Sequence, residues 1–184
     1  MGKSTTAQMF RDEGVPVWDA DATVHQLYAK GGAAVPAFAE VLPQAVIDGA
    51  VDRSALKALI AKDPETIKTI ESIVHPLVAA DRAEFLAAQD APLVVFDIPL
   101  LFETGADAWL DSVLVVSAPA DVQKERVLAR GAMDEAMFAQ ILSRQMPDAE
   151  KRRKADHVIE TLTLDATRAA VRKLIAELSG ADDA

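Results

Sequence analysis

The chain has 184 residues, and 51% of them are hydrophobic, which is enough to bury a core and excludes disorder as the main state. The 29 acidic and 19 basic residues give a formal charge of −10, which disfavours general nucleic-acid binding. Cysteine is absent, so disulfides, thiolate catalysis and cysteine-bound metals are excluded. The chain has no apolar run near the roughly 20 residues of a membrane span and no recognisable signal peptide, and we expect a cytoplasmic protein.

The first elements that the sequence predicts are a helix, a short strand and a long helical region. Residues 3–13 have helix-forming composition, and Gly14 is placed to end that helix. The apolar run 15–18 predicts a strand that leads into residues 19–21. Residues 23–89 are largely helical in character, with breaks at 31–32, 42–43 and 48–49.

After residue 90 the predicted strands and helices alternate. Residues 93–97 are apolar up to Asp97, as is typical of a parallel strand that is covered on both faces. Further strands are predicted at 113–116 and 157–159, and helices over 121–130, from 137 to about 147, and around 171–178. This alternation predicts an α/β fold with a parallel sheet and right-handed crossovers.

The sequence Gly2-Lys3-Ser4-Thr5 opens the first predicted helix and matches the second half of the phosphate-binding loop, G-x-x-x-x-G-K-[ST]. In that loop glycine lets backbone amides approach phosphates, lysine reaches the outer phosphates, and a hydroxyl holds magnesium. A bare GKST also occurs in solvated chain ends. The interpretation as a phosphate-binding loop therefore needs support from other residues.

Three aspartates follow predicted strands, where α/β folds open their ligand crevice. Asp19 and Asp21 can face the same side of an extended segment, where an acid could accept the proton of an attacking hydroxyl. The alternative is that these aspartates only cap the following helix. We expect the two together to cap the helix and also to form part of a site. Asp97 resembles the acid that holds magnesium in nucleotide-binding sheets, or it is an ordinary strand-end acid.

Taken together, the motifs resemble the dephospho-CoA kinases over nearly the whole chain. The most discriminating ones are D-x-P-L-L-x-E at 97–103, D-A-D at 19–21 and the His75-Pro76 pair. The similarity extends to D-G-x-V-D-R at 48–53, Q-x-x-R at 123–126 and A-D-H-V-I at 155–159. The resemblance implies a P-loop NTPase fold, a parallel sheet flanked by helices.

The resemblance also implies a domain organisation and a reaction. Residues 1–30 and 91–184 would form the nucleotide-binding core, with a lid at about 126–150, and residues 31–90 a helical insert that binds dephospho-CoA. The enzyme would use ATP and Mg²⁺ to phosphorylate the ribose 3′-hydroxyl of dephospho-CoA, the last step of coenzyme A biosynthesis. Nucleic acid and membrane are not expected as partners.

Matching positions then receive roles by resemblance. ATP binding is implied for Gly2, Lys3, Ser4, Thr5, Arg126 and Arg130, and catalysis for Asp21 as the base, Lys3 and Arg144. Contacts with the acceptor are implied for Asp19, His75, Leu101 and Glu103, and Mg²⁺ binding for Ser4 and Asp97. Two alternatives stay open: His75 could cap a turn before Pro76, and any one arginine could be a solvated surface charge.

Other interpretations of the whole chain are another small-molecule kinase, such as a nucleotide or shikimate kinase, and a catalytically silent nucleotide-binding homologue. The basic run at 151–154 is interpreted as a solvated helix end rather than a nucleic-acid site. Members of the family begin with an apolar strand and a glycine-rich turn, roughly ten residues that would precede Met1. We therefore expect Met1 to be an internal methionine of the phosphate loop.

Overall fold

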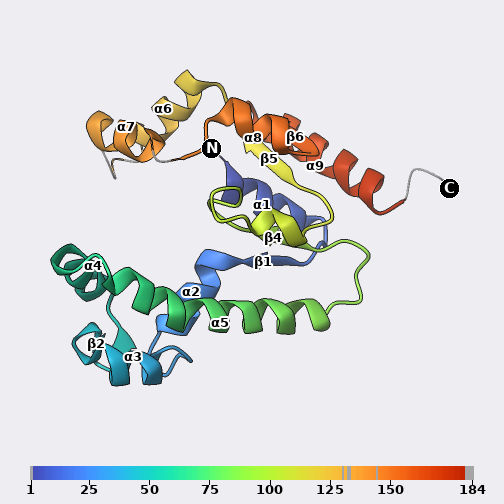
Figure 1. Cartoon of the computed structure of the whole chain (residues 1–184). Helices are drawn as coiled ribbons and strands as arrows, with labels where there is room; N and C mark the ends of the chain where they lie inside the picture. Colours follow the sequence, from blue (N-terminus) through green and yellow to red (C-terminus); the bar gives the residue numbers. More distant parts are fainter. Residues whose placement is uncertain (1, 130, 132–133, 144, 181–184) are drawn as a thin grey trace. The chain divides into compact units, whose positions relative to one another are not determined.

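The computed structural model describes residues 2–129, 131, 134–143 and 145–180 (Figure 1). Its residues divide into two compact units, Met1–Val17 with Ala91–Ala184, and Trp18–Asp90. Each unit has a hydrophobic core of its own.

The first unit is an arrangement of helices around short strands. Its helices are α1 (Lys3–Asp12), α6 (Ala120–Ala129), α7 (Glu135–Ser143), α8 (Asp148–Lys154) and α9 (Leu164–Leu178), with a 3-10 turn η2 (Ala106–Trp109). Its strands are β4 (Val95–Asp97), β5 (Leu114–Ser117) and β6 (His157–Glu160). Strands β5 and β6 are parallel, in a register from Leu114 opposite His157 to Ser117 opposite Glu160. The predicted helices and strands are thus present, with β4 two residues shorter than the predicted strand at 93–97.

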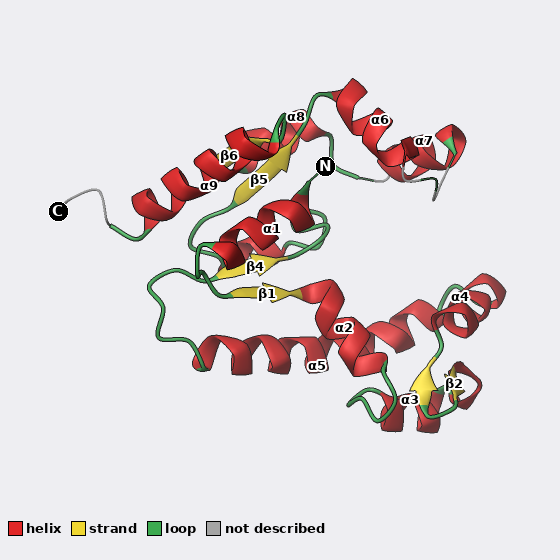
Figure 2. Ribbon diagram, turned by 180° about the vertical axis from the view of Figure 1, so that it is seen from behind, coloured by secondary structure: helices red, strands yellow, loops and turns green. Residues whose placement is uncertain are grey.

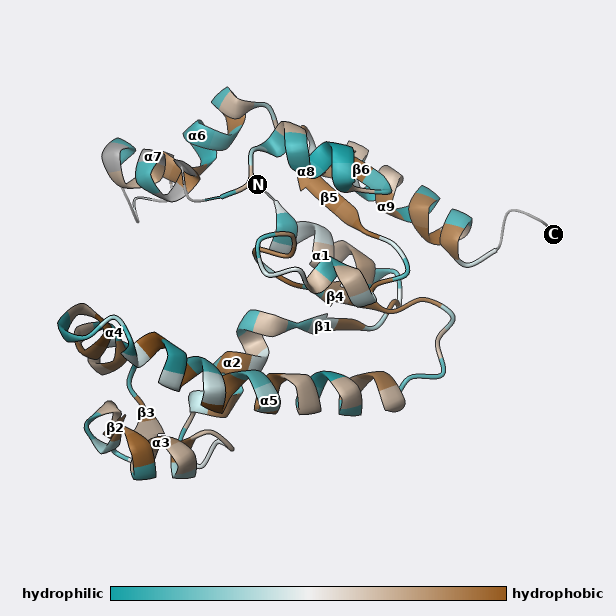
Figure 3. Cartoon of the chain, viewed as in Figure 1, coloured by the Kyte–Doolittle hydropathy of each residue, from teal (hydrophilic) through white to brown (hydrophobic). Residues whose placement is uncertain are grey.

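The core of the first unit explains why its two long amphipathic segments are helices. Met9 and Phe10 of α1 are 3% exposed, and Val171 and Leu174 of α9 are buried against the same cluster. Hydrophobic residues three or four positions apart share one helix face, so α1 and α9 can pack together. The apolar composition of β5 is visible along its whole length, whereas α8 is strongly polar (Figure 3).

The second unit contains four helices and a small hairpin (Figure 2). The helices are α2 (Ala20–Tyr28), α3 (Val35–Val41), α4 (Arg53–Lys62) and α5 (Thr66–Ala87), with a 3-10 turn η1 (Pro43–Ala45). Strands β2 (Val46–Ile47) and β3 (Ala50–Val51) are antiparallel. Asp48 and Gly49 join them with φ values of 51° and 79°, the left-handed conformation that an Asp-Gly hairpin turn adopts.

Strand β1 (Val17–Asp19) begins at Val17, the last residue of the segment Met1–Val17 of the first unit. At this point the chain lies beside β4, because the Val95 N–H donates to the Pro16 carbonyl at 2.9 Å. The described strands pair two by two, as β1 with β4, β2 with β3 and β5 with β6. Strands flanked by helices confirm the predicted α/β class. In the part of the chain that the structure describes, no helix is both long and apolar enough to cross a membrane.

The structure excludes one open alternative and corrects one local expectation. Helix α5 continues through Pro76, so His75 does not cap a turn there. One face of α5 packs on the core of the second unit through Val74, Ile70 and Leu77, and this burial outweighs the loss of one backbone hydrogen bond. Asp21 does not share an extended segment with Asp19, because α2 begins at Ala20.

Candidate functional site

The phosphate-loop motif lies where α1 begins. Gly2 precedes the helix with a φ of 98°, a conformation that glycine adopts at no steric cost. A Cβ atom on Gly2 would stand 3.1 Å from the side chain of Thr161, so the backbone also approaches the end of β6 closely. The first turn of α1 contains no acidic residue. The partial positive charge of this helix end is therefore available to an anion.

Lys3 and Asp97 form an ion pair beside this helix end. Lys3 Nζ lies 2.6 Å from Asp97 Oδ1. The carboxylate is 4% exposed and the lysine side chain 41% exposed, so the acid is fixed within the unit while the amine reaches solvent. Asp97 Oδ1 has no aligned hydrogen bond among the described residues, so the contact is mainly electrostatic. The structure thus brings together two residues that the sequence assigned to phosphate and metal.

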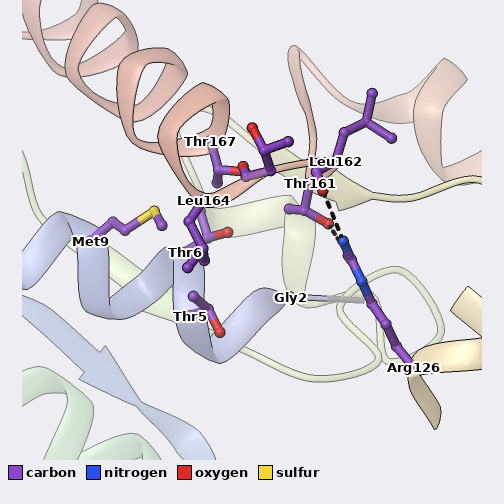
Figure 4. A pocket seen from close by; sticks show the side chains of 10 residues that line it. Gly2, Thr5, Thr6, Met9, Arg126, Thr161, Leu162, Leu164 and Thr167 are labelled. Carbon is purple, nitrogen blue, oxygen red and sulfur yellow. Dashed lines mark hydrogen bonds between the residues drawn. The ribbon is translucent and has the colours of Figure 1, made fainter. Parts of the chain in front are cut away.

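A cavity of about 230 Å³ opens beside the same helix end (Figure 4). It is lined by Gly2, Thr5, Thr6, Met9, Arg126, Thr161, Leu162, Thr163, Leu164 and Thr167. Arg126 of α6 donates from Nη1 to Thr161 Oγ1 and from Nη2 to the Leu162 carbonyl, each at 3.1 Å. Its guanidinium is held at the cavity by residues 161–162 and is not a purely solvated charge.

The residues after β6 are the part of this cavity that sequence reasoning missed. Thr161 is 6% exposed, and its hydroxyl donates to the Ser117 carbonyl at 3.2 Å. Leu162 and Leu164 remain 53% and 65% exposed, which offers apolar surface to a ligand. One signal was present: ligands of α/β proteins bind at the carboxyl ends of parallel strands, and β6 ends directly before Thr161.

Three of the remaining predicted site residues, Asp19, Asp21 and His75, lie in the second unit. Asp19 caps α2, because its Oδ1 accepts a hydrogen bond from the Ala22 N–H at 2.9 Å. Asp21 is exposed in the first turn of α2, and His75 is exposed on α5. Both can therefore contact a ligand.

The segment from Asp97 to Glu103 continues from β4 into a loop. Glu103 Oε1 accepts hydrogen bonds from the Met146 N–H at 2.8 Å and from Lys151 Nζ at 2.9 Å. Partial burial acts to raise the pKa of Glu103, but the bonds from Lys151 and Met146 outweigh it and lower that pKa below its ordinary 4.5. Leu101 is half-buried in the same loop. Arg130 and Arg144, predicted at ATP and at the reacting phosphate, lie outside the described residues.

The basic run at 151–154 differs from its sequence interpretation. Lys151 is only 14% exposed in its ion pair with Glu103, and Arg152 Nη2 lies 2.8 Å from Glu160 Oε1. Lys154 lies over the ring of Phe102 at 5.3 Å. These side chains attach α8 to the rest of the first unit, and they are not simply a solvated face.

Helix α1 begins with a glycine-lysine-hydroxyl sequence, and the lysine forms an ion pair with a buried acid at the end of a strand. These features define a P-loop nucleotide-binding protein of the small kinase class. A family model described as dephospho-CoA kinase matches residues 1–165. The chain belongs to the dephospho-CoA kinase family, and its enzyme activity is that of a kinase.

Named relatives support this assignment over the full chain. A dephospho-CoA kinase of Cereibacter sphaeroides is 57% identical over all of this chain and 93% of its own length. One from Jannaschia sp. is 58% identical over 97% and 92% of the two chains. Among solved structures, TT1252 from Thermus thermophilus has a TM-score of 0.81 at 38% identity, covering 96% of this chain and 92% of its own. A dephospho-CoA kinase from Campylobacter jejuni has a TM-score of 0.71 at 26% identity, covering 98% and 93%.

Proposed function

We propose that this kinase transfers the γ-phosphoryl group of ATP to the ribose 3′-hydroxyl of dephospho-CoA. The observation that carries the proposal is the Lys3–Asp97 ion pair at the start of α1, beside a cavity of about 230 Å³ in a chain of this family. Gly2, Lys3, Ser4 and Thr5 hold the ATP phosphates at the helix end, and Arg126 contacts the nucleotide at the cavity. The cytoplasmic location of the protein stays a prediction.

The first unit supplies the donor site in this proposal. Phosphoryl transfer needs little covalent work from a protein, so positioning and positive charge dominate catalysis. Lys3 can turn from Asp97 to an incoming phosphate because its side chain is 41% exposed. Arg130 and Arg144, in the proposed lid at about 126–150, would add positive charge at the transferred group.

The second unit supplies the acceptor site. Asp21 acts as the base that takes the proton of the 3′-hydroxyl, since its carboxylate is exposed at the start of α2. Asp19 supports it by capping the helix. His75 of this unit is proposed as a further contact with dephospho-CoA, as are Leu101 and Glu103 of the first unit, and the helical residues 31–90 are proposed as the insert that binds it.

The residues at the start of α1 fit a magnesium ion. Mg²⁺ prefers hard oxygen ligands, and it commonly uses one or two carboxylates together with water and substrate phosphates. Asp97 offers a buried carboxylate, whose Oδ1 lies 2.6 Å from Lys3 Nζ, and Ser4 offers an exposed hydroxyl in the first turn of α1. When bound, the ion neutralises charge on the transferred phosphate.

The test is an ADP-release assay with ATP and dephospho-CoA on the wild-type chain and on Asp21→Asn. The variant keeps the size of the side chain but loses its basicity, and we expect kcat to fall about 100- to 10,000-fold. ATP affinity, measured by titration calorimetry, should change less than about twofold, since the proposal assigns Asp21 to the acceptor and not to ATP. Asp90→Asn, which removes an exposed acid of the same unit, is the matched control.

Three results would count against the proposal. If Asp21→Asn turns over dephospho-CoA at the wild-type rate, Asp21 is not the base. Phosphorylation of a nucleoside monophosphate or shikimate, with no turnover of dephospho-CoA, favours another small-molecule kinase. ATP binding without turnover of any acceptor favours a silent nucleotide-binding homologue.

A further inference from the structure

A carboxylate on α5 receives two hydrogen bonds from the residues around the D-A-D motif. Asp81 Oδ1 accepts from Trp18 Nε1 at 2.6 Å and from Thr23 Oγ1 at 2.9 Å. Trp18 and Thr23 are each 5% exposed, and Asp81 is half-buried. The three residues belong to the second unit, and α2 packs against α5 there.

The two donors stand on either side of the proposed catalytic segment. Trp18 directly precedes Asp19, and Thr23 follows Asp21 by two residues in α2. Asp81 therefore ties the chain to α5 both before and after the motif. Between these ties, the Asp19 cap fixes the first turn of α2. The backbone that carries Asp21 is held at three points.

The chemistry of this contact favours a carboxylate. An indole N–H can only donate, so a buried tryptophan needs an acceptor, and a hydroxyl can donate to the same oxygen. Hydrogen bonds to an ionised acceptor are roughly twice as strong as neutral ones. Both donors converge on one oxygen atom, which restricts where β1 ends and where α2 begins.

We infer that Asp81 is a positioning residue for the D-A-D motif, which sets the place of Asp21 through Trp18 and Thr23. The inference rests on the proposed role of Asp21 as the base. Reacting groups must stand within a narrow distance of each other, and a displacement of about 1 Å can cost 100-fold in rate. Loss of the Asp81 carboxylate should therefore lower kcat and leave ATP binding unchanged.

The experiment compares Asp81→Ala, Asp81→Asn and Glu84→Ala in the full chain. Glu84 is an exposed acid of the same helix, so its removal changes the charge equally without touching the motif. We expect Asp81→Ala to lower kcat about 10- to 100-fold, with the KM for ATP within about twofold. Asp81→Asn keeps an acceptor oxygen and should recover most of the activity, and Glu84→Ala should match the wild type.

A double variant separates positioning from stability. Asp21→Asn with Asp81→Ala should have the kcat of Asp21→Asn alone, because a residue that acts through Asp21 adds nothing once the base is gone. If Asp81→Ala does not fold, Thr23→Val and Trp18→Phe each remove one donor and keep most of the packing. Each should lower kcat about 3- to 10-fold, corresponding to the loss of one hydrogen bond.

Several outcomes would overturn the inference. One is a lower melting temperature of Asp81→Ala with wild-type kcat in the folded protein, and another is a raised KM for dephospho-CoA alone. Wild-type kcat in both Thr23→Val and Trp18→Phe would overturn it as well. If Asp21→Asn loses turnover while Asp81→Ala does not, the inference fails and the proposed function stands. If Asp21→Asn retains turnover, the proposed role of Asp21 fails first.

Discussion

Lys3 and Asp97 show how unequal burial assigns different tasks to the two members of an ion pair. The carboxylate is 4% exposed and ends a strand, whereas the amine lies 41% exposed in the first turn of α1. A phosphate that approaches the helix end would compete with Asp97 for the lysine. In the structure the acid holds Lys3 Nζ at 2.6 Å, beside the start of α1.

Replacing Lys3 by methionine removes this charge while keeping the length of the side chain. We expect kcat/KM for ATP to fall about 100-fold or more, as for other groups that stabilise transition-state charge. The free energy of unfolding should fall by about 1–3 kcal/mol, since Asp97 loses its partner. Steady-state kinetics and urea unfolding measure both effects. Lys173→Met, at an exposed position of α9, is the control, and wild-type turnover in Lys3→Met would contradict the role.

Thr161 and the Leu162 carbonyl together hold Arg126 at the cavity. Thr161→Val keeps the shape that packs on Gly2 but removes the acceptor of Arg126 Nη1 and the donor to Ser117. Loss of a hydrogen bond of about 1 kcal/mol corresponds to a KM for ATP raised about 3- to 10-fold with little change in kcat. An unchanged KM would indicate that Arg126 does not depend on this contact.

Among the elements, α8 shows how a short polar helix is kept in place. It has seven residues, too few to be stable alone, and none of them is buried. Its side chains form ion pairs and hydrogen bonds on three sides: Asp148 with the buried Ser117, Arg152 with Glu160, and Lys151 with Glu103. The amphipathic pattern of the sequence cannot predict these contacts, because the partners lie outside α8 and two of the three pairs join residues more than 30 positions apart.

Glu103 makes the attachment of α8 dependent on pH. The lowered pKa of Glu103 means that the folded state stabilises its charged form. Its contribution is present above the unfolded pKa of about 4.5 and is lost as the pH falls through the lower folded value. At every pH between 7 and 5.5, the free energy of unfolding of Glu103→Gln should be about 1 kcal/mol lower than that of the wild type.

That difference between the wild type and Glu103→Gln should shrink below pH 4.5, as urea unfolding at several pH values can show. Glu177→Gln, at an exposed position of α9, should show no such dependence. A difference that stays constant down to pH 3 would contradict the ion-pair account.

Helix α5 shows why the alternative of a turn before Pro76 fails. Proline disfavours a helix interior locally, yet Pro76 lies within 22 helical residues. The packing of Ile70, Val74 and Leu77 on the second core overrides that preference. Local sequence therefore predicts the helical region correctly, whereas only burial decides where it is continuous.

At the scale of the whole molecule, the described residues form two separate cores. Phe38 is fully buried in the second unit, with its ring edge-on to Tyr28 at 5.5 Å between centroids. Val171 is fully buried in the first unit. The two core clusters have no described residue in common, so each can lose stability independently.

Phe38→Ala should destabilise the second unit by about 3–5 kcal/mol, because it leaves a cavity in that core. We expect scanning calorimetry to resolve an early transition for this unit while the first unit unfolds at its original temperature. Val171→Ala should instead lower the transition of the first unit. Val41→Ala, at a position 52% exposed, serves as the control. A single shifted transition in Phe38→Ala would show that the two units unfold together.

The net charge of −10 does not describe the site, since both proposed ligands are polyanions. Lys3, Arg126 and the start of α1 gather positive charge locally on an acidic chain. This follows from the position of the residues in the fold, and composition alone gives no indication of it.

The sequence by itself determined the family, the α/β class, most helices and strands, and the residues of the phosphate loop, since these depend on local periodicity and contiguous motifs. Only the tertiary structure decided that Asp97 pairs with Lys3, that Thr161 and Leu162 hold Arg126, and that Asp81 holds Trp18 and Thr23. Each of these contacts joins residues more than 30 positions apart. Such pairs are created by the packing of elements, which local patterns do not encode.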